Sequence, residues 1–301
     1  MLQKIHWKDL REIADFPELM TELDGTLKLV EIELFNYCNR KCSFCPNETI
    51  DRKTNFIALS ESSFINVLKD LKDKEFAGYI SFSRYNEPLS HINLLKKRAL
   101  QVREYLPKVT TIFNTNGDFL SKDKLKMLSV DEISIMDYDH KGLEKCIERM
   151  ERTGIKILES DYPFIKGKFE NISILYYVDF VENHILMNDR GGVLKQYSLK
   201  EKRTAPCLEP ERFAGIDYNG NMMACCVTRS DIKSHKNYIL GNINEKSITD
   251  IFNSPKAIRL RKNASEGNFT EDMKPCHYCP YKLGRYRRDK VELDYEKGTD
   301  Y

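Results

Sequence analysis

Short apolar runs alternate with stretches of helical periodicity through the first half of the chain. The runs are rich in β-branched and aromatic residues, which predicts strands, whereas the stretches between them repeat apolar residues every three or four positions, which predicts helices. The predicted strands span 29–35, 77–83, 109–117 and 131–137, and the predicted helices span 60–74, 91–106, 121–128 and 141–154. This alternation indicates βαβ units, and hence an α/β fold with a parallel sheet.

Local signals support the helix starts and suggest how the chain divides. Ser60 and Ser121 stand where N-caps are expected, each with acids or amides in the turn that follows. Residues 1–28 carry apolar residues at helical spacing and predict an N-terminal helical cap. From about 171 the helical pattern stops, so we expect the first domain to span 29–200.

The remainder of the chain is rich in cysteine and then in charge. The stretch "GIDYNGNMMACC" predicts two strands joined by an Asn-Gly turn. It lies among clustered cysteines, and we therefore expect a small cysteine-ligated α+β domain over 201–282. The last segment, 283–301, mixes both charge signs with few apolar residues, which predicts a solvated tail.

Composition narrows the function classes. The 301 residues are 41% hydrophobic and 31% charged, as in globular proteins, and their net charge of +2 gives no bulk attraction to nucleic acid or anionic membranes. No signal-peptide pattern and no run of about 18 apolar residues occurs, so we expect a cytoplasmic protein without a membrane partner. Nine cysteines in such a chain indicate metal binding rather than disulfides.

Three cysteines form a compact array directly after the first predicted strand. Cys38, Cys42 and Cys45 have the spacing C-x3-C-x2-C in "FNYCNRKCSFCPN". A zinc site completed by a distant ligand is one interpretation. The other is a [4Fe–4S] cluster, in which three thiolates hold three irons and leave the fourth open to a small chelating molecule.

This array resembles the hallmark of the radical S-adenosylmethionine (SAM) superfamily, whose members place it after the first strand of a partial (β/α)6 TIM-like barrel. The resemblance continues at the ends of later strands, where "SFSRYNEPL" is similar to the G-G-E-P segment and "FNTNG" to the T-N-G segment. It implies a three-cysteine [4Fe–4S] cluster that binds S-adenosyl-L-methionine. The residues implied to contact this cofactor are Phe44, Asn86, Glu87, Thr115, Asn116 and Ser134.

A second cysteine set has four members. Cys207, Cys225, Cys276 and Cys279 form C-x17-C-x50-C-x2-C, which fits either a zinc site or a fully ligated cluster. The set resembles the twitch domain, a shortened SPASM domain, and this resemblance implies an auxiliary [4Fe–4S] cluster. Cys225 is the expected ligand, with Cys226 as the alternative.

Within the superfamily, the chain resembles twitch-type dehydrogenases that act on aminocyclitols, the 2-deoxy-scyllo-inosamine dehydrogenase type. That resemblance implies a 5′-deoxyadenosyl radical that takes hydrogen from a hydroxyl-bearing carbon, and an auxiliary cluster that accepts the second electron as a ketone forms. It implies catalytic roles for Arg190 in "NDRGG", as a hydrogen-bond donor to the substrate oxygen, and for Tyr85. The expected partners are a small polar substrate and an electron donor such as flavodoxin or ferredoxin.

Two positions depart from the dehydrogenase pattern, and other functions remain open. Asn114 stands where a tyrosine is expected, and Val227 where an acid is expected. An epimerase would return hydrogen from a thiol, for which Cys226 and Cys146 are the candidates. A ribosomal-peptide maturase and a zinc-binding interaction module are the further alternatives.

Overall fold

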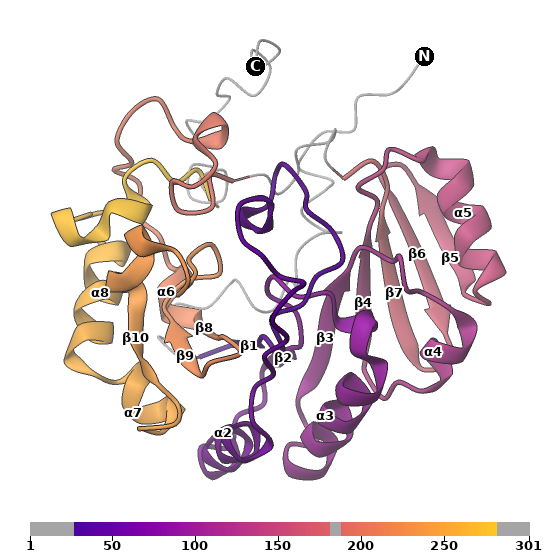
Figure 1. Cartoon of the computed structure of the whole chain (residues 1–301), viewed down its shortest axis with the longest axis horizontal. Coiled ribbons are helices and arrows are strands. Elements are labelled where there is room, and N and C mark those ends of the chain that lie inside the picture. The colour runs from indigo at the N-terminus through magenta and orange to yellow at the C-terminus, as the bar shows by residue number, and fades with distance from the viewer. Residues whose placement is uncertain (1–26, 181–187, 282–301) are drawn as a thin grey trace.

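A single ten-stranded sheet crosses the molecule in the computed structural model, which describes residues 27–180 and 188–281 (Figure 1). The strand order is β10-β9-β8-β1-β2-β3-β4-β7-β6-β5. The bounds of the strands are β1 Leu29–Ile32, β2 Tyr79–Ser81, β3 Thr110–Thr115, β4 Glu132–Met136, β5 Lys156–Asp161, β6 Phe164–Phe169, β7 Ile172–Tyr177, β8 Phe213–Ile216, β9 Asn221–Met223 and β10 Ile239–Asn242. The helical cap predicted for 1–28 and the tail predicted for 283–301 fall almost entirely outside the described residues.

The predicted βαβ alternation is confirmed for the first four strands. Strands β1 to β4 pair in parallel in chain order, and β7 continues the parallel run beside β4. The intervening helices are α2 Glu61–Asp73, α3 Ile92–Tyr105, α4 Lys122–Lys126 and α5 Gly142–Arg152. Ser60 and Ser121 cap α2 and α4 as predicted, each accepting a hydrogen bond from the backbone N–H three residues on.

The chain departs from simple alternation after α5. Strands β5 and β6 were not predicted, and they form an antiparallel extension that joins the parallel sheet through β7. Most residues of β5 are exposed, so its sequence "KILESD" lacks the apolar pattern of a strand. The barrel is therefore partial, with the parallel strands β1 to β4 and β7 followed by the antiparallel pair β6 and β5.

The C-terminal region continues the same sheet. Strand β8 pairs in parallel with β1, and the predicted Asn-Gly turn connects β8 to β9, with Gly220 at a φ of +83°. Its helices are α6 Glu209–Arg212, α7 Ile248–Phe252 and α8 Pro255–Ser265, and Figure 1 shows them on the opposite side of the molecule from α5. The predicted domain boundary near residue 200 stays a prediction, because the sheet is continuous across it.

Among the described residues there are also five short 3-10 helices: η2 Pro46–Glu48, η3 Pro88–His91, η4 Lys195–Tyr197, η5 Lys233–Tyr238 and η6 Glu271–Cys276. Two of them adjoin cysteines of the two sets, η2 after Cys45 and η6 at Cys276. No described helix is long and apolar enough to cross a bilayer.

Strand alternation gives the central sheet two different faces. Val30, Ile80, Phe113 and Ile133 are buried in the main hydrophobic core, which stabilises the sheet by removing apolar surface from water. On the other face the register brings Asn114 beside Ser134, and Asn114 is exposed although it lies within the sheet. This polar face is open for ligands at the carboxyl ends of the parallel strands, where α/β folds build their sites.

Candidate functional site

The three-cysteine loop begins directly after β1. Cys38, Cys42 and Cys45 are all half-buried, and a turn closes the loop where Cys45 N–H donates to the Cys42 carbonyl at 2.9 Å. Burial raises the pKa of Cys38 to about 11 and that of Cys42 to about 12, and repulsion by the neighbouring thiols adds to both shifts. The three thiols are thus held near one another, and they require a metal centre to become thiolates at neutral pH.

Arg40, inside this loop, clamps it to the ends of two strands. Its guanidinium pairs with Asp118 after β3, with Nε to Oδ2 at 2.7 Å, and with Asp139 after β4, with Nη1 to Oδ1 at 2.6 Å. Asn39 also donates to Asp118 at 2.7 Å. Two bidentate ion pairs from one side chain fix the loop against the sheet.

Removing the clamp is expected to weaken cluster retention. In Arg40→Gln both ion pairs are lost, so the loop becomes ordered only when the cluster binds. The free-energy cost of ordering the loop then reduces the affinity for the cluster. We expect cluster affinity to fall about 10- to 100-fold, as for other residues that orient metal ligands. The loss of iron–sulfur absorbance during a chelator challenge measures this effect. Arg103→Gln removes a comparable ion pair, with Asp131, away from the loop; equal iron loss in both variants would contradict the clamp role.

Glu87 gathers residues predicted to contact S-adenosylmethionine. Its buried carboxylate accepts from Thr115 Oγ1 at 2.6 Å, from Asn116 N–H at 2.9 Å and from Leu89 N–H at 3.1 Å. Burial nevertheless raises the pKa of Glu87 to about 7. The "NEP" and "TNG" segments are therefore joined through one carboxyl group, which braces the ends of β2 and β3.

The other predicted cofactor contacts lie around this brace. The Asn86 side chain donates to the Phe82 carbonyl at 3.2 Å and accepts from Arg84 N–H, so it shapes the turn after β2. Phe44 packs against Tyr138, with ring centroids 4.9 Å apart. Ser134 lies on β4 in register with exposed Asn114. The structure thus places these segments toward the carboxyl ends of the parallel strands. Their direct contacts with the cofactor remain predictions.

The second cysteine set lies in the C-terminal region and is more deeply buried. Cys207, Cys225 and Cys279 are buried, and Cys276 is half-buried at the end of η6. Burial and local hydrogen bonds have the larger effects on the pKa values of Cys225, Cys276 and Cys279. Electrostatic repulsion from the Cys207 thiol raises the pKa of each of these three further. Four mutually repelling thiols match the ligands of an iron–sulfur cluster.

Within this set, the surroundings favour Cys225 over Cys226. Cys225 is buried and interacts electrostatically with Cys207, whereas Cys226 is half-buried, hydrogen-bonds with Tyr281 and interacts with the Arg190 charge. The main-chain carbonyl of Cys226 accepts a hydrogen bond from the Tyr85 hydroxyl at 3.1 Å. The assignment of Cys225 as ligand remains a proposal supported by this arrangement.

The geometry of the thiols bears on the kind of metal centre. In residues 27–180 and 188–281, no three His, Cys, Asp or Glu side chains lie close enough to share one metal ion. A tetrahedral zinc with bonds of ~2.3 Å would hold its sulfurs about 3.8 Å apart. A [4Fe–4S] cube carries one iron per thiolate and needs a wider ligand shell. Three and four cysteines are donor sets that iron–sulfur clusters use, so both sets fit such clusters by their chemistry.

Arg203 ties the loops of the second set together and was not singled out by its sequence. This buried guanidinium donates to four main-chain carbonyls, at distances of 2.8 to 3.1 Å, on both sides of the cysteine set. The acceptors belong to Ala205, Pro206, Cys279 and Tyr281. A buried cation at this place also lowers the electrostatic cost of a negatively charged cluster.

Tyr238 contacts a sulfur of the second set directly. Its hydroxyl, on a fully buried side chain, lies 2.8 Å from Cys276 Sγ and is the donor when that sulfur is a thiolate ligand. A hydrogen bond to a cluster sulfur stabilises the more negative, reduced state, and so raises the reduction potential.

We therefore expect Tyr238→Phe to lower the auxiliary reduction potential by on the order of tens of millivolts. A redox titration followed by electron paramagnetic resonance measures the shift, and iron content shows whether the cluster is retained. Tyr105→Phe, at the end of α3, serves as the matched control. An unchanged potential in a fully loaded Tyr238→Phe protein would contradict the role of this hydrogen bond.

The two residues predicted to be catalytic, Arg190 and Tyr85, lie together between the cysteine sets. Arg190 Cζ is 5.9 Å from the centroid of the Tyr85 ring, and its charge interacts with both Cys45 and Cys226. Arg190 Nε is buried and has no hydrogen-bond partner within the described residues. A buried donor without a partner is costly, and Arg52 Nε is the other such atom among the described residues.

The loop that carries Arg190 is held by its neighbours. Arg190 has a φ of +49°, and Asp189 accepts from Gly191 N–H at 3.1 Å and from Ser198 Oγ at 3.2 Å. The buried His235 ring reaches the Gly191 carbonyl from the C-terminal region, at 3.0 Å from Nε2. These contacts position the arginine between the two halves of the molecule.

The sequence patterns did not single out the other charged residues around Tyr85. Arg229 Cζ lies 4.4 Å from the centroid of the Tyr85 ring, and Arg84 pairs with Glu31 at 3.3 Å. Glu33 pairs with Arg52 at 2.7 Å and accepts from Tyr85 N–H. The two acids at alternate positions of the apolar run "LVEIELF" are the signal that could have indicated them, because such residues share one face of a strand.

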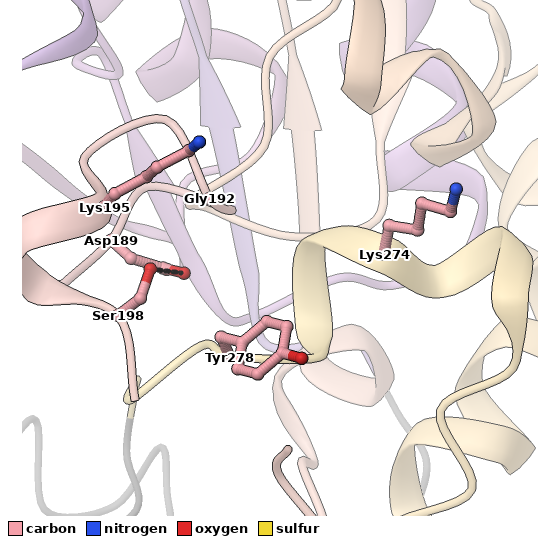
Figure 2. A pocket seen from close by; sticks show the side chains of 6 residues that line it. All are labelled: Asp189, Gly192, Lys195, Ser198, Lys274 and Tyr278. Atoms are coloured by element: carbon pink, nitrogen blue, oxygen red, sulfur yellow. Dashed lines mark hydrogen bonds between the residues drawn. The ribbon is translucent and has the colours of Figure 1, made fainter. Parts of the chain in front are cut away.

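A surface pocket of about 290 Å³ adjoins the second cysteine set. It is lined by Asp189, Gly192, Lys195, Ser198, Lys274 and Tyr278. Figure 2 shows Lys195 and Lys274 on opposite sides, with Tyr278 and the hydrogen-bonded pair Asp189–Ser198 nearby. Asp189 interacts with the Cys279 thiol, so one lining residue contacts a cysteine of the second set.

Comparisons with known proteins agree with this arrangement. The model of the radical SAM superfamily matches residues 32–136, and the SPASM model, an iron–sulfur cluster-binding domain, matches residues 207–280. These domains imply a [4Fe–4S] cluster and an auxiliary cluster. A curated relative from Niallia circulans, S-adenosyl-L-methionine-dependent 2-deoxy-scyllo-inosamine dehydrogenase, is 28% identical over 246 residues, which are 82% of this chain and 90% of the relative.

Solved structures show the same fold. The crystal structure of BtrN in complex with AdoMet and 2-DOIA matches with a TM-score of 0.65 at 23% identity, covering 85% of this chain and 94% of BtrN. BtrN in an open conformation matches with a TM-score of 0.57, also at 23% identity, covering 84% of this chain and 94% of BtrN. The arrangement of the sheet and the C-terminal region is thus one that known structures share.

Proposed function

Because the chain carries a radical SAM domain over residues 32–136 and an iron–sulfur cluster-binding domain over residues 207–280, we propose that it oxidises a hydroxyl-bearing carbon of a small polar substrate to a ketone. The substrate class is an aminocyclitol or a related sugar-like polyol, in line with the activity named for the curated relative. When bound, the two clusters and S-adenosylmethionine supply the hydrogen-abstracting radical and the acceptor for the second electron.

The first cluster would be held by Cys38, Cys42 and Cys45, and the auxiliary cluster by Cys207, Cys225, Cys276 and Cys279. The three-cysteine set leaves one iron without a protein ligand, where the amine and carboxylate of S-adenosylmethionine would bind. The four-cysteine set leaves none, which suits electron acceptance rather than cofactor cleavage.

Arg190 carries the argument for the site of oxidation. Its buried Nε has no hydrogen-bond partner among the described residues, and its charge interacts with Cys45 and Cys226, so it would be available to donate to a substrate oxygen. A guanidinium stays protonated, so Arg190 would orient the hydroxyl and stabilise negative charge as the hydroxyl proton leaves. Tyr85 would form one wall of the substrate site, since its hydroxyl is engaged by the Cys226 carbonyl.

An epimerase that returns a hydrogen atom from Cys226 is the second candidate. The Cys226 thiol is half-buried and interacts with Arg190. Cys146 does not suit this role, because it is fully buried in α5 and its thiol donates to Asp137 at 3.7 Å. We also propose a reductant such as flavodoxin or ferredoxin, and a cytoplasmic location, where the nine free cysteines would stay reduced.

A substrate screen with the reconstituted protein tests the proposal. Polyols and aminocyclitols are incubated anaerobically with S-adenosylmethionine and a reductant in deuterated water, and 5′-deoxyadenosine release identifies the substrate. The expected product is a ketone. A product of unchanged oxidation state that carries solvent deuterium, and that is lost in Cys226→Ala while 5′-deoxyadenosine still forms, would favour the epimerase instead.

A further inference from the structure

The inference below rests on the proposed function. In that function, the oxidation of an alcohol to a ketone leaves one electron inside the protein. The substrate loses one hydrogen atom to the adenosyl radical, one proton from its hydroxyl group, and one electron. The electron remains with the auxiliary centre and must leave before the next turnover. The protein therefore needs a route by which an external acceptor approaches the second cysteine set.

The pocket in Figure 2 lies at the right place for such an approach. Tyr278, which is 43% exposed, directly precedes Cys279 in the chain, and Asp189 touches the Cys279 thiol. Lys274 stands two residues before Cys276. Two of the lining residues are thus next to, or in contact with, Cys279, and a third lies two residues from Cys276, so a partner seated on the pocket approaches the cluster closely.

The charge of the pocket is positive at its mouth. Lys195 and Lys274 are both exposed and form no ion pair within residues 27–180 and 188–281. The one acid in the lining, Asp189, is fully buried and engaged by Gly191 and Ser198, so it presents no charge to solvent. Two unpaired ammonium groups around an exposed aromatic side chain fit an acidic protein surface, since complementary charge speeds and orients association.

We propose that this pocket is the docking site of a small acidic electron-carrier protein, with a flavin or an iron–sulfur cofactor, which takes up the electron from the auxiliary cluster. The carrier gains one electron and the auxiliary cluster loses one, so the transfer balances without a further reactant. Lys195 and Lys274 are docking residues in this proposal, and neither takes part in hydrogen abstraction or cofactor binding.

A double-mixing experiment with the reconstituted holoenzyme tests the docking site. Enzyme that carries one reducing equivalent is first mixed with substrate and S-adenosylmethionine, which gives a single turnover and leaves the auxiliary cluster reduced. A second mixing adds oxidised flavodoxin or ferredoxin, and the carrier's absorbance reports its reduction. In Lys195→Glu/Lys274→Glu we expect the second-order rate at low salt to fall about 10-fold or more, and the salt dependence of the wild type to be lost.

Two controls make the result specific. Lys126→Glu/Lys145→Glu makes the same charge change at exposed positions of α4 and α5, away from the pocket, and is expected to behave as wild type. A small uncharged oxidant is expected to reoxidise all variants at one rate, which shows that the cluster is intact. If ketone forms in the first mixing but the pocket variant matches wild type, or the control pair loses as much, the docking site is wrong. If no ketone forms, the proposed function fails and the inference fails with it.

Discussion

Replacing Cys42 by alanine is expected to abolish reductive cleavage of S-adenosylmethionine while leaving the auxiliary cluster in place. The three-cysteine set has no spare thiol, since a single loss leaves two ligands for a cluster that already has one open iron. The four cysteines of the second set lie in another part of the structure, so the auxiliary cluster keeps its ligands. We therefore expect roughly half of the wild-type iron to remain, since one of two four-iron clusters is lost.

The measurement is 5′-deoxyadenosine formation together with iron and sulfide content. Cys146→Ala is the matched control, because this cysteine is buried in α5 away from both sets. It should retain full iron and normal cofactor cleavage if it folds. Full iron content in Cys42→Ala, with cleavage unchanged, would contradict the assignment of the three-cysteine set.

The second large effect is expected at Arg190. In Arg190→Gln the proposed donor to the substrate oxygen loses its charge, and ketone formation should fall by about 10²- to 10³-fold in kcat/KM, as when one stabilising donor is removed from other active sites. Cofactor cleavage does not need this donor. The ratio of ketone to 5′-deoxyadenosine should therefore fall, which shows uncoupling rather than misfolding.

Arg190→Lys is the informative companion variant. A lysine keeps the positive charge but not the planar fork of donors, so we expect activity between that of Arg190→Gln and that of wild type. Equal amounts of ketone and 5′-deoxyadenosine in Arg190→Gln, formed at the wild-type rate, would contradict the role of Arg190 in orienting the substrate.

Local patterns predicted the local structure well. Ser60 and Ser121 cap helices as expected, because an N-cap is decided by the few residues around it. The first four strands and the turn at Gly220 were likewise predictable from short-range signals. The strand β5 was not, because its exposed residues are held by pairing with β6 rather than by an apolar pattern of their own.

Long-range contacts were beyond the sequence patterns. The cysteine spacings indicated two metal centres and their resemblance indicated the superfamily, yet nothing local to Arg40 shows that it pairs with Asp118 and Asp139. The pairing of β8 with β1 also joins residues that are far apart in the chain. Such features depend on how elements pack, so they became visible only in the folded molecule.

A single turnover with one reducing equivalent per protein tests most directly whether the substrate is oxidised to a ketone with the auxiliary cluster as electron acceptor. The substrate found by the screen is mixed anaerobically with the reconstituted enzyme and S-adenosylmethionine, and products and cluster oxidation states are measured together. We expect equal amounts of ketone and 5′-deoxyadenosine, and a reduced auxiliary cluster detected by electron paramagnetic resonance. A product of unchanged oxidation state, with the auxiliary cluster still oxidised, would contradict this expectation.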